Sequence, residues 1–420
     1  MKKSSINIIN LGCRLNIYEG EVIKTITHNN KISNYTIINS CAVTHEAEKK
    51  VNYEIRKSKK NFPKKKIIVT GCAAQINPKK YADMKEVDFV IGNKEKLEKK
   101  TWNSLSKKIP MRVKNIFADN KINNNVVEKF EGKSRAYIEI QQGCDHRCTF
   151  CIIPFGRGNN RSVPVGVIAE RIQLLVNNGY NEVVLTGVDI TDYGKDLPGK
   201  PNLFQLVKRI LNLIPKLKQL RLSSIDCAEI TDDFWPLLYE KRLMPHFHLS
   251  LQAGNNLILK RMKRRHNREQ VIDFCKKARS IRNDIVFGAD IIAGFPTETD
   301  VMFEDSIKMI QECNLTHLHI FPYSIRENTP AAKMPQISRD VIKRRAKILR
   351  DEGRKQMEKY LQKQIGNSAL MLVEQVKENT SYGKSQHFTR IRIKDKVKEG
   401  KIIKCIITGI NQGILNAQLI

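Results

Sequence analysis

The stretch "CDHRCTFC", residues 144–151, places Cys144, Cys148 and Cys151 at a C-x3-C-x2-C spacing. It comes directly after "AYIEIQQG", residues 136–143, whose short apolar run is typical of a buried strand. Structural zinc sites take four ligands, usually from two C-x2-C pairs, and His146 offers a fourth ligand only from inside the loop. Three thiolates on a cubane iron–sulfur cluster leave one iron with an open position. The spacing therefore favours such a cluster over structural zinc.

Five more apolar runs follow this strand, and each ends in small or polar residues. They are "NEVVLTGVD", "QLRLSSID", "HFHLSLQAG", "GADIIAGFP" and "THLHIFPYS", with helix-like stretches such as 167–177 and 268–281 between them. Six β-α units predict a partial (β/α)6 barrel whose functional residues gather at the carboxyl ends of the strands. Any one of these polar ends, taken alone, is also typical of an ordinary turn. The residues that we expect to bind a cofactor at this mouth are Gly187, Asp189, Ser224, Asp226, Ser250, Gln252, Gly294, Pro296 and Tyr323.

The amino-terminal residues contain three short apolar runs that each end in a cysteine. "INIINLGC" ends at Cys13, "YTIINSC" at Cys41 and "KKIIVTGC" at Cys72, and a helix-like stretch follows each run. This alternation predicts a parallel sheet, in which the three cysteines meet at one edge. Three unrelated small residues in strand-to-helix turns would give the same spacing. Because all three runs end in this way, we expect a shared metal site.

The last third of the chain is predicted to contain a long helix followed by several short strands. Residues 338–364 read as a long basic helix that begins at a Ser cap. Short strand-like runs at 368–376, 389–395, 401–410 and 413–420 then predict a small β-barrel. Cations with an aromatic among them suit phosphate contact and base stacking, although a polar edge strand with a buried Phe is an alternative. The candidate RNA-binding residues are Lys384, His387, Phe388, Arg390 and Arg392.

The composition limits the class of protein. Lys and Arg outnumber Asp and Glu by 74 to 43, a formal charge of +31 that favours a polyanionic partner such as RNA, but is equally consistent with solvated surface lysines. Ten cysteines in 420 residues are too sparse for a disulfide scaffold. Since no run approaches the ~20 apolar residues of a membrane span, we expect a cytoplasmic protein without membrane contact. The isolated cysteines, which we expect to be inert, are Cys227, Cys275, Cys313 and Cys405.

Several motifs resemble those of the radical S-adenosylmethionine methylthiotransferases. "GCDHRCTFCIIPFGRGNNRS" resembles the family's cluster loop, with Ile-Pro and Arg-Gly after the third cysteine, and the resemblance covers nearly the whole chain. Asn328 stands where the family often has Gly, which puts a loop near the cofactor in doubt, and the spacing of Cys13, Cys41 and Cys72 is compact. The other motifs, in family order, are "NLGCRLNIYEGE", "NSCAVTHEAEKK", "VTGCAAQ", "LTGVDITDYG", "LSLQAGNNLILKRMKRRH", "DIIAGFPTETD" and "FPYSIRENTPAAKM".

The resemblance implies an architecture and a set of cofactors. It implies an amino-terminal domain at 1–110, a radical S-adenosylmethionine barrel at 130–362 and a TRAM-like RNA-binding barrel at 363–420. It further implies two 4Fe–4S clusters, the radical-generating one on Cys144, Cys148 and Cys151 and an auxiliary one on Cys13, Cys41 and Cys72, whose open iron carries the sulfur to be inserted. By the same resemblance, two S-adenosylmethionine molecules are used per product. One methylates the sulfur, and the other becomes the radical that removes hydrogen from a ring carbon.

The implied substrate is a modified adenosine at position 37 of tRNA. "GCDHRCTFCIIPFGRGNNRSVP" and "NSCAVT" look most like the threonylcarbamoyladenosine group, with the isopentenyladenosine enzymes as the alternative, and the basic charge favours tRNA over a ribosomal protein. We expect a monomer that takes electrons from a flavodoxin or ferredoxin-like donor and sulfur from an unknown donor. A rival hypothesis is a zinc-containing RNA-binding protein without catalysis, which explains the charge and the cysteines but not six strands with polar ends.

Overall fold

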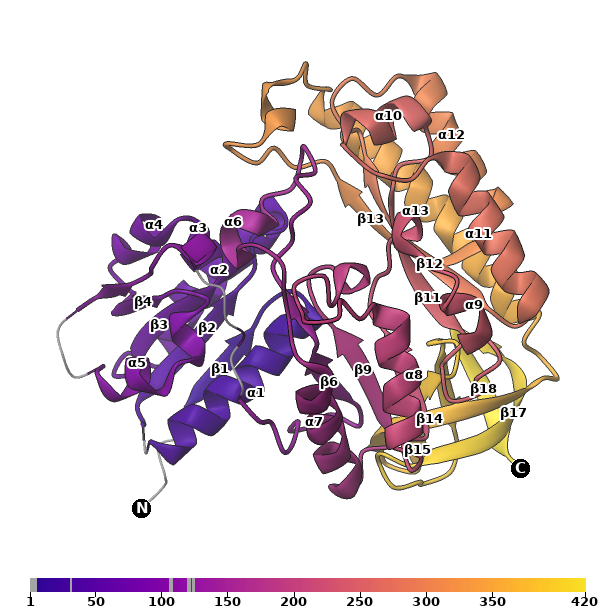
Figure 1. The fold of residues 1–420 in the computed structure, drawn as a ribbon, viewed down its shortest axis with the longest axis horizontal. Helices are drawn as coiled ribbons and strands as arrows, with labels where there is room; N and C mark the ends of the chain where they lie inside the picture. Colours follow the sequence, from indigo (N-terminus) through magenta and orange to yellow (C-terminus); the bar gives the residue numbers. More distant parts are fainter. Residues whose placement is uncertain (1–5, 31, 106–108, 119–121, 123–124) are drawn as a thin grey trace.

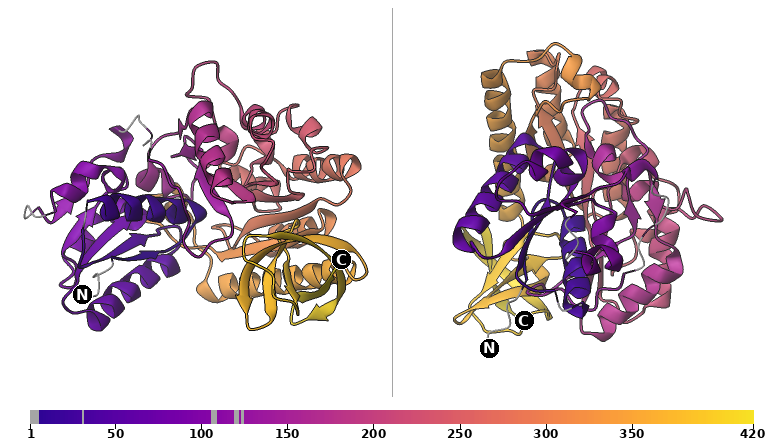
Figure 2. Two further views of the ribbon diagram at one scale, coloured as in Figure 1. Left: turned by 90° about the horizontal axis from the view of Figure 1, so that it is seen from below. Right: turned by 90° about the vertical axis from the view of Figure 1, so that its left-hand side faces the viewer.

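The computed structural model describes residues 6–30, 32–105, 109–118, 122 and 125–420. Three units follow one another along the chain (Figure 1): an amino-terminal unit with a parallel sheet, a central open barrel and a small carboxy-terminal barrel. Figure 2 shows the amino-terminal unit beside the central barrel, and the carboxy-terminal barrel packed against another part of it. The mixed α/β architecture predicted from the sequence is confirmed.

The amino-terminal sheet has five parallel strands in chain order. They are β1 (Asn7–Asn10), β2 (Tyr35–Ser40), β3 (Lys66–Gly71), β4 (Phe89–Ile91) and β5 (Met111–Arg112), so the sheet ends just beyond the expected boundary at residue 110. Its helices are α1 (Arg14–Asn29), α2 (His45–Asn61), α3 (Cys72–Ile76), α4 (Pro78–Ala82) and α5 (Lys99–Asn103). Because β1, β2 and β3 are neighbours and parallel, the residues that follow them emerge at one edge.

The central unit contains the six predicted strands, all parallel. One sheet has the order β10 (Gln219–Leu222), β9 (Glu182–Thr186), β6 (Ala136–Glu139), and the other the order β11 (His246–Gln252), β12 (Val286–Ala293), β13 (Leu315–Pro322). Single bridges, Leu220 to Leu243 and Ile225 to Leu249, connect the β10 edge to the β11 edge. The six strands therefore form an open barrel that begins at β6 and ends at β13. A short ladder, β7 (Gln141–Gln142) with β8 (Arg161–Ser162), lies at its mouth.

Helices cover the outside of this barrel, where alternate strand residues such as Leu249, Leu251 and Ile291 are buried. Residue Asn267 caps α11 by a reciprocal capping box with Gln270, which explains why this helix begins where the sequence predicts. Ser338 stands at the cap position of α13, but its side chain makes no cap hydrogen bond to the described residues, contrary to expectation. The helices are α6 (Ile153–Arg157), α7 (Val165–Asn177), α8 (Leu203–Leu213), α9 (Phe234–Leu237), α10 (Asn256–Arg261), α11 (Arg268–Ile281), α12 (Asp300–Glu312) and α13 (Arg339–Gln362).

The carboxy-terminal unit is a closed barrel in the order β14-β15-β16-β18-β17. The sequence predicts four of its strands but misses β15, because "TSYGKS" lacks the apolar alternation of a strand. Met371, Ile391 and Cys405 are among the buried residues of its core. The strands are β14 (Ser368–Lys377), β15 (Thr380–Ser385), β16 (Arg390–Ile393), β17 (Ile402–Asn411) and β18 (Ile414–Leu419).

This small barrel packs against the amino ends of the central strands. Arg221 of β10 donates hydrogen bonds to the backbone carbonyls of Ser385 (2.9 Å) and Gln386 (2.8 Å). Arg135, just before β6, pairs with both Glu182 of β9 and Glu374 of β14. The cysteine loop lies at the opposite, carboxyl ends of these strands. Among the described residues, no helix has the length and apolarity that crossing a membrane requires.

Candidate functional site

The first group of cysteines lies in the loop between β7 and α6, at the mouth of the open barrel. Cys144 donates its backbone N–H to the Gly158 carbonyl (3.1 Å), and Cys151 donates to the Cys148 carbonyl (3.0 Å). Between them, Thr149 donates its hydroxyl to the Arg261 carbonyl (2.8 Å) and thereby ties the loop to α10. Burial raises the pKa of the Cys151 thiol to about 12, and the nearby Cys148 adds to this effect. The three thiols are close enough to influence one another's pKa, and their shared cluster stays a prediction.

Charged side chains surround this group. An Nη of Arg264 lies 3.5 Å from the Cys148 sulfur, and its other Nη donates to Asp226 (2.7 Å). Asp189 approaches the Cys144 sulfur to 3.9 Å and the His146 Nε2 to 3.0 Å. The hydrogen bond to Asp189, with help from Glu229, raises the pKa of His146 to about 9. His146 therefore pairs with carboxylates, and the loop offers three thiols rather than three thiols and an imidazole.

The second group forms where β1, β2 and β3 end. Cys13 caps α1, Cys41 follows β2, and Cys72 is the first residue of α3. Gly12 and Gly71, which precede two of these cysteines, have φ values of +94° and +93°, a region that favours glycine. A Cβ at Gly12 would lie 2.8 Å from the Cys41 sulfur, so only glycine leaves the room that these thiols share. The shared site predicted from three separate strand ends is consistent with this geometry.

Arg157, the last residue of α6, connects the two groups. It is buried, its Nε lies 3.0 Å from the Cys72 sulfur, and it pairs with Glu19 of α1. Lys96 donates to the other side of Glu19 at 2.7 Å. Burial alone would raise the pKa of Glu19, but Arg157 and Lys96 hold it at about 2. Arg157 also stands close to Cys13 and Cys72, where a fixed positive charge favours thiolates.

Both groups fit a cluster that is held by three thiolates and leaves one position open. Each places three thiols together and an arginine beside one of them: Arg264 at Cys148 and Arg157 at Cys72. All six cysteines are free thiols. The sequence analysis did not single out either arginine, although both lie inside the quoted motifs "IIPFGRG" and "RMKRRH".

The predicted cofactor-binding residues lie largely at this mouth. Asp189 and Asp226 contact the cysteine loop and Arg264, whereas Ser250 and Gln252 are partly exposed at the end of β11. The ring of Phe295 stacks edge-on with Tyr323 (5.7 Å) and with Phe150 of the cysteine loop (6.4 Å). Gly187 follows β9, Ser224 follows β10, and Pro296 is buried in the turn after β12.

Gly294, which directly follows β12, lies close to α13. Its φ is +74°, and a Cβ there would lie 2.6 Å from Ile342 of α13, so the residue serves the packing of that helix.

Comparison with known proteins decides the family. A model described as "Radical SAM superfamily" matches residues 138–310, and one described as "Uncharacterized protein family UPF0004" matches residues 5–92. The threonylcarbamoyladenosine tRNA methylthiotransferase MtaB of Rickettsia prowazekii is 50% identical over 414 residues, which cover 98% of this chain and 97% of that protein. The chain belongs to the radical S-adenosylmethionine methylthiotransferase family. It is therefore an enzyme, which rules out the hypothesis of a non-catalytic zinc protein.

More distant relatives agree with this assignment, and a solved structure shows the same fold. The protein of the same name from Bacillus subtilis is 32% identical, over 94% of this chain and 91% of that one. The tRNA-2-methylthio-N(6)-dimethylallyladenosine synthase of Orientia tsutsugamushi is 32% identical, over 86% of each. The radical S-adenosylmethionine methyltransferase TsrM from Kitasatospora setae shares the fold with a TM-score of 0.56 at 13% identity, covering 78% of this chain and 77% of that one. Membership of the family implies S-adenosylmethionine and a 4Fe–4S cluster.

The structure separates the five candidate RNA-binding residues of this methylthiotransferase. Arg390 is exposed, and Arg392 bonds to Asn416 within the small barrel. Lys384 and Phe388 face the central barrel rather than open solvent, since the Phe388 ring contacts His246 and Arg221. His387 is buried and lies 3.2 Å from Asp284, so it belongs to the packing between the two barrels. The five residues do not form one surface.

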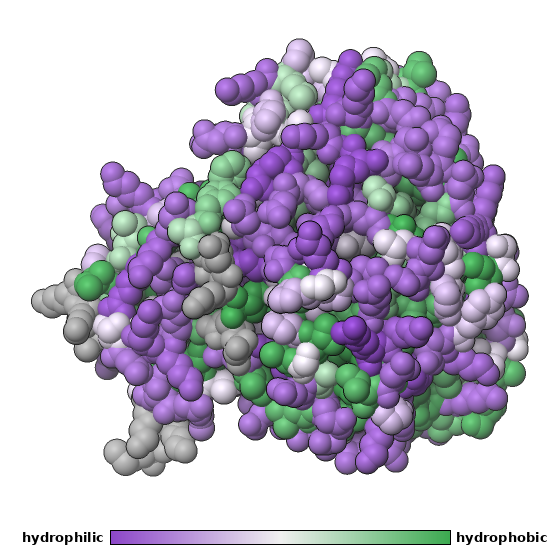
Figure 3. All heavy atoms as spheres, viewed as in Figure 1, coloured by the Kyte–Doolittle hydropathy of each residue, from purple (hydrophilic) through white to green (hydrophobic). Residues whose placement is uncertain are grey.

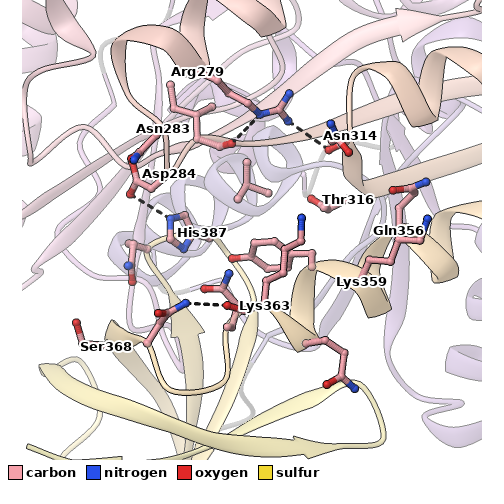
Figure 4. Close-up of a pocket in the computed structure, with 17 residues that line it drawn as sticks. Arg279, Asn283, Asp284, Asn314, Thr316, Gln356, Lys359, Lys363, Ser368 and His387 are labelled. Carbon is pink, nitrogen blue, oxygen red and sulfur yellow. Dashed lines mark hydrogen bonds and ion pairs between the residues drawn. The ribbon is translucent and has the colours of Figure 1, made fainter.

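A groove of about 950 Å³ opens on the His387 side of this packing. Figure 4 shows His387 turned toward Asp284, with Lys359 and Lys363 of the α13 end across the groove. Arg279 of α11 reaches the carbonyls of Ile285 and Asn314 at its far end. The groove is polar and lies away from the cysteines, at the amino ends of the strands.

Proposed function

We propose that this enzyme methylthiolates N6-threonylcarbamoyladenosine at position 37 of tRNA. One observation carries the proposal: the chain, which contains two groups of three cysteines, is 50% identical over nearly its full length to a protein named for this activity. The formal charge of +31 suits an RNA partner. Hydrophilic side chains cover much of the face seen in Figure 3.

Each group of cysteines has its own role in this proposal. Cys144, Cys148 and Cys151 would hold the cluster at the barrel mouth, and Cys13, Cys41 and Cys72 would hold a second 4Fe–4S cluster. When bound, these groups and S-adenosylmethionine, two per product, supply the radical and the sulfur that a ring carbon needs, because protein side chains alone do not perform this chemistry.

The chain's own residues position and shield the reactants. Arg264, anchored on Asp226, keeps a positive charge beside Cys148. The exposed ends of β11, at Ser250 and Gln252, offer polar groups to S-adenosylmethionine. The rings of Phe150, Phe295 and Tyr323 form an apolar side of the mouth that excludes water. Arg157 keeps the second group facing the first by binding Glu19 of the amino-terminal unit.

The proposal also names partners. The protein would act as a monomer, take electrons from a flavodoxin or ferredoxin-like protein and obtain sulfur from a further donor. Phosphates of tRNA would contact exposed cations, of which Arg390 on the small barrel is one.

Nucleoside analysis of tRNA tests the proposal. In a strain that lacks the gene, mass spectrometry should show N6-threonylcarbamoyladenosine without its methylthio derivative, and the wild-type gene should restore the derivative. A Cys148→Ala gene should not. If the deletion instead removed the methylthio derivative of isopentenyladenosine, the isopentenyladenosine alternative would replace this proposal. If no methylthio nucleoside changed, both would be wrong.

A further inference from the structure

Phe388 lies at the floor of the open barrel, by which we mean the amino ends of its strands. Its backbone has a strained conformation. It lies in the turn between β15 and β16 with a φ of +66°, a conformation that is costly for a bulky residue and is kept only where the surroundings impose it. Its ring stacks on His246, the first residue of β11, with centroids 5.5 Å apart and planes 18° apart. The turn therefore holds an aromatic ring at the amino ends of the central strands.

Four cations surround this ring. The Lys384 Nζ lies 3.4 Å from the ring centroid, and the guanidinium carbons of Arg135, Arg221 and Arg14 lie at 5.1, 5.2 and 5.4 Å. They come from three units of the fold, because Arg14 begins α1 of the amino-terminal unit and Lys384 belongs to the small barrel. We call these four residues and Phe388 the floor cluster.

The floor cluster has more positive than negative charge. Glu182 binds Arg135 and Arg221, and Glu374 binds Arg135. Within the part of the chain that the structure describes, Arg14 and Lys384 make no hydrogen bond or ion pair. Burial, reinforced by Arg135, lowers the pKa of Lys384 to about 8, and the nearby Glu374 opposes this only in part.

Buried polar atoms around the floor cluster also lack partners. The Nη2 of Arg135 and the Nε2 atoms of His246 and His317 are buried without a hydrogen bond to any described residue. Arg135 itself is only 6% exposed. Unsatisfied buried donors are rare and costly in folded proteins, and a bound anion would satisfy them.

Polar side chains that are at least partly exposed lie on the central strands between the mouth and the floor cluster, and the buried His248 separates Ser250 from His246. Ser250 and Asp290 are partly exposed and His319 is exposed, whereas their strand neighbours Leu249 and Ile291 are fully buried against the helices. The exposed set therefore faces the hollow of the barrel. From Ser250 at the mouth to His246 at the floor, β11 spans roughly 13 Å, the rise of four residues.

We propose that the floor cluster, through Arg14 and Lys384, binds the carboxylate of the threonylcarbamoyl group on the substrate adenosine. This inference rests on the proposed function. A threonyl residue that is attached through its amino nitrogen keeps a free carboxylate, which charged donors bind strongly. An apolar dimethylallyl group offers no such charge and would leave the Arg14 and Lys384 side chains partly desolvated without an ion-pair partner. The floor cluster would therefore determine specificity between the two kinds of substrate.

The test compares two anticodon stem-loop RNAs, one with N6-threonylcarbamoyladenosine and one with its threonine methyl ester, which is neutral. With wild-type enzyme, esterification should lower kcat/KM by about 10-fold to 100-fold, the range of a charged hydrogen bond. Lys384→Met should lower kcat/KM for the acid by at least about 10-fold and for the ester by less than about twofold. Lys384→Arg should retain most of the preference, and Arg14→Gln should behave like Lys384→Met at unchanged iron content.

Lys404→Met is the matched control, since Lys404 is an exposed lysine of β17 outside the floor cluster, and it should leave both rates unchanged. Equal rates of the wild type on acid and ester would overturn the inference, whether or not any variant folds. So would an equal loss on both RNAs in Lys384→Met, which would indicate a phosphate contact. A wild type that modifies neither RNA, but modifies one with isopentenyladenosine, would instead contradict the proposed function.

Discussion

At the scale of single residues, the two groups of cysteines differ in what surrounds them. Cys148 lies in the loop at the mouth with the Arg264 guanidinium beside it. Cys41 is buried between Gly12 and Cys72, and burial raises the pKa of its thiol to about 11. Because ligation is local to each group, substitutions in the two groups should have separable effects.

Replacing Cys148 with Ala should remove one of three ligands from the mouth. Iron content of the anaerobically purified protein should fall by about half, and reductive cleavage of S-adenosylmethionine to 5′-deoxyadenosine should be lost. Chromatography of the nucleoside products measures this. Cys405→Ala, a buried cysteine of the small barrel, is the control and should keep full cleavage. Normal cleavage by Cys148→Ala would mean that the assignment of the cluster is wrong.

Replacing Cys41 with Ala should give the reverse pattern. Cleavage of S-adenosylmethionine should persist, since the mouth keeps its three thiols, but no methylthio nucleoside should form. Iron should again fall by about half, because the loss is confined to the group that contains Cys41. Normal methylthio product from this variant would contradict a shared site at the ends of β1, β2 and β3.

At the scale of elements, α6 is fixed to the amino-terminal unit by one buried cation. Arg157, its last residue, binds Glu19 of α1 and the Cys72 sulfur of α3. Asn93, after β4, also donates its side-chain amide to the Gly156 carbonyl. Ile152 and Ile153, at the start of the helix, also pack against the core of the amino-terminal unit, so polar and apolar contacts together hold α6 there.

Arg157→Met should remove the charge while keeping much of the side-chain volume. Glu19 would then be left buried with Lys96 as its remaining cation and the Gln142 amide as a further donor, and the loss of one partner of a buried pair costs about 3–5 kcal/mol of the free energy of unfolding. Urea unfolding measures this. Arg209→Met on the exposed face of α8 should change stability by less than about 0.5 kcal/mol. An Arg157→Met variant as stable as the Arg209→Met control would show that the pair is not needed.

At the scale of the whole molecule, the charge of +31 and the position of the small barrel govern how tRNA binds. Of the five candidate cations and aromatics there, Arg390 is exposed, whereas Lys384, His387 and Phe388 face the central barrel. Phosphate contacts should therefore come from exposed cations spread over the surface, whereas Lys384 should act on the modified base and His387 should serve the packing between the two barrels.

The salt dependence of tRNA affinity tests this division. The logarithm of the association constant should fall linearly with the logarithm of the salt concentration, and Arg390→Gln should reduce the slope by about one unit if it contacts a phosphate. Lys384→Met should leave the slope unchanged, because its partner is on the base. Fluorescence anisotropy with labelled tRNA measures both. A slope that changes for Lys384→Met but not for Arg390→Gln would reverse the two roles.

The sequence by itself determined most of the helices and strands and identified the candidate ligands. The parallel sheet and its common edge were predictable from the apolar runs that end at Cys13, Cys41 and Cys72. The alternation of side chains along a strand and the direction of each strand are local properties, which the sequence records. The six apolar runs with polar ends likewise predicted the six parallel strands of the open barrel. The strand β15 was not predicted, because its mostly polar residues lack the apolar alternation that indicates a strand.

Only the tertiary structure decided which distant charges meet. Arg157 and Glu19 lie 138 residues apart in sequence, and Arg14 and Phe388 come from opposite ends of the chain, yet each pair is in contact. The segment 382–393 offered Lys384, His387, Phe388, Arg390 and Arg392 as candidate RNA-binding residues, and the structure places Lys384, His387 and Phe388 against the central barrel and Arg390 in solvent. The physical reason is that strand periodicity records which side of a strand is buried, whereas the partner of a buried charge depends on how whole domains dock.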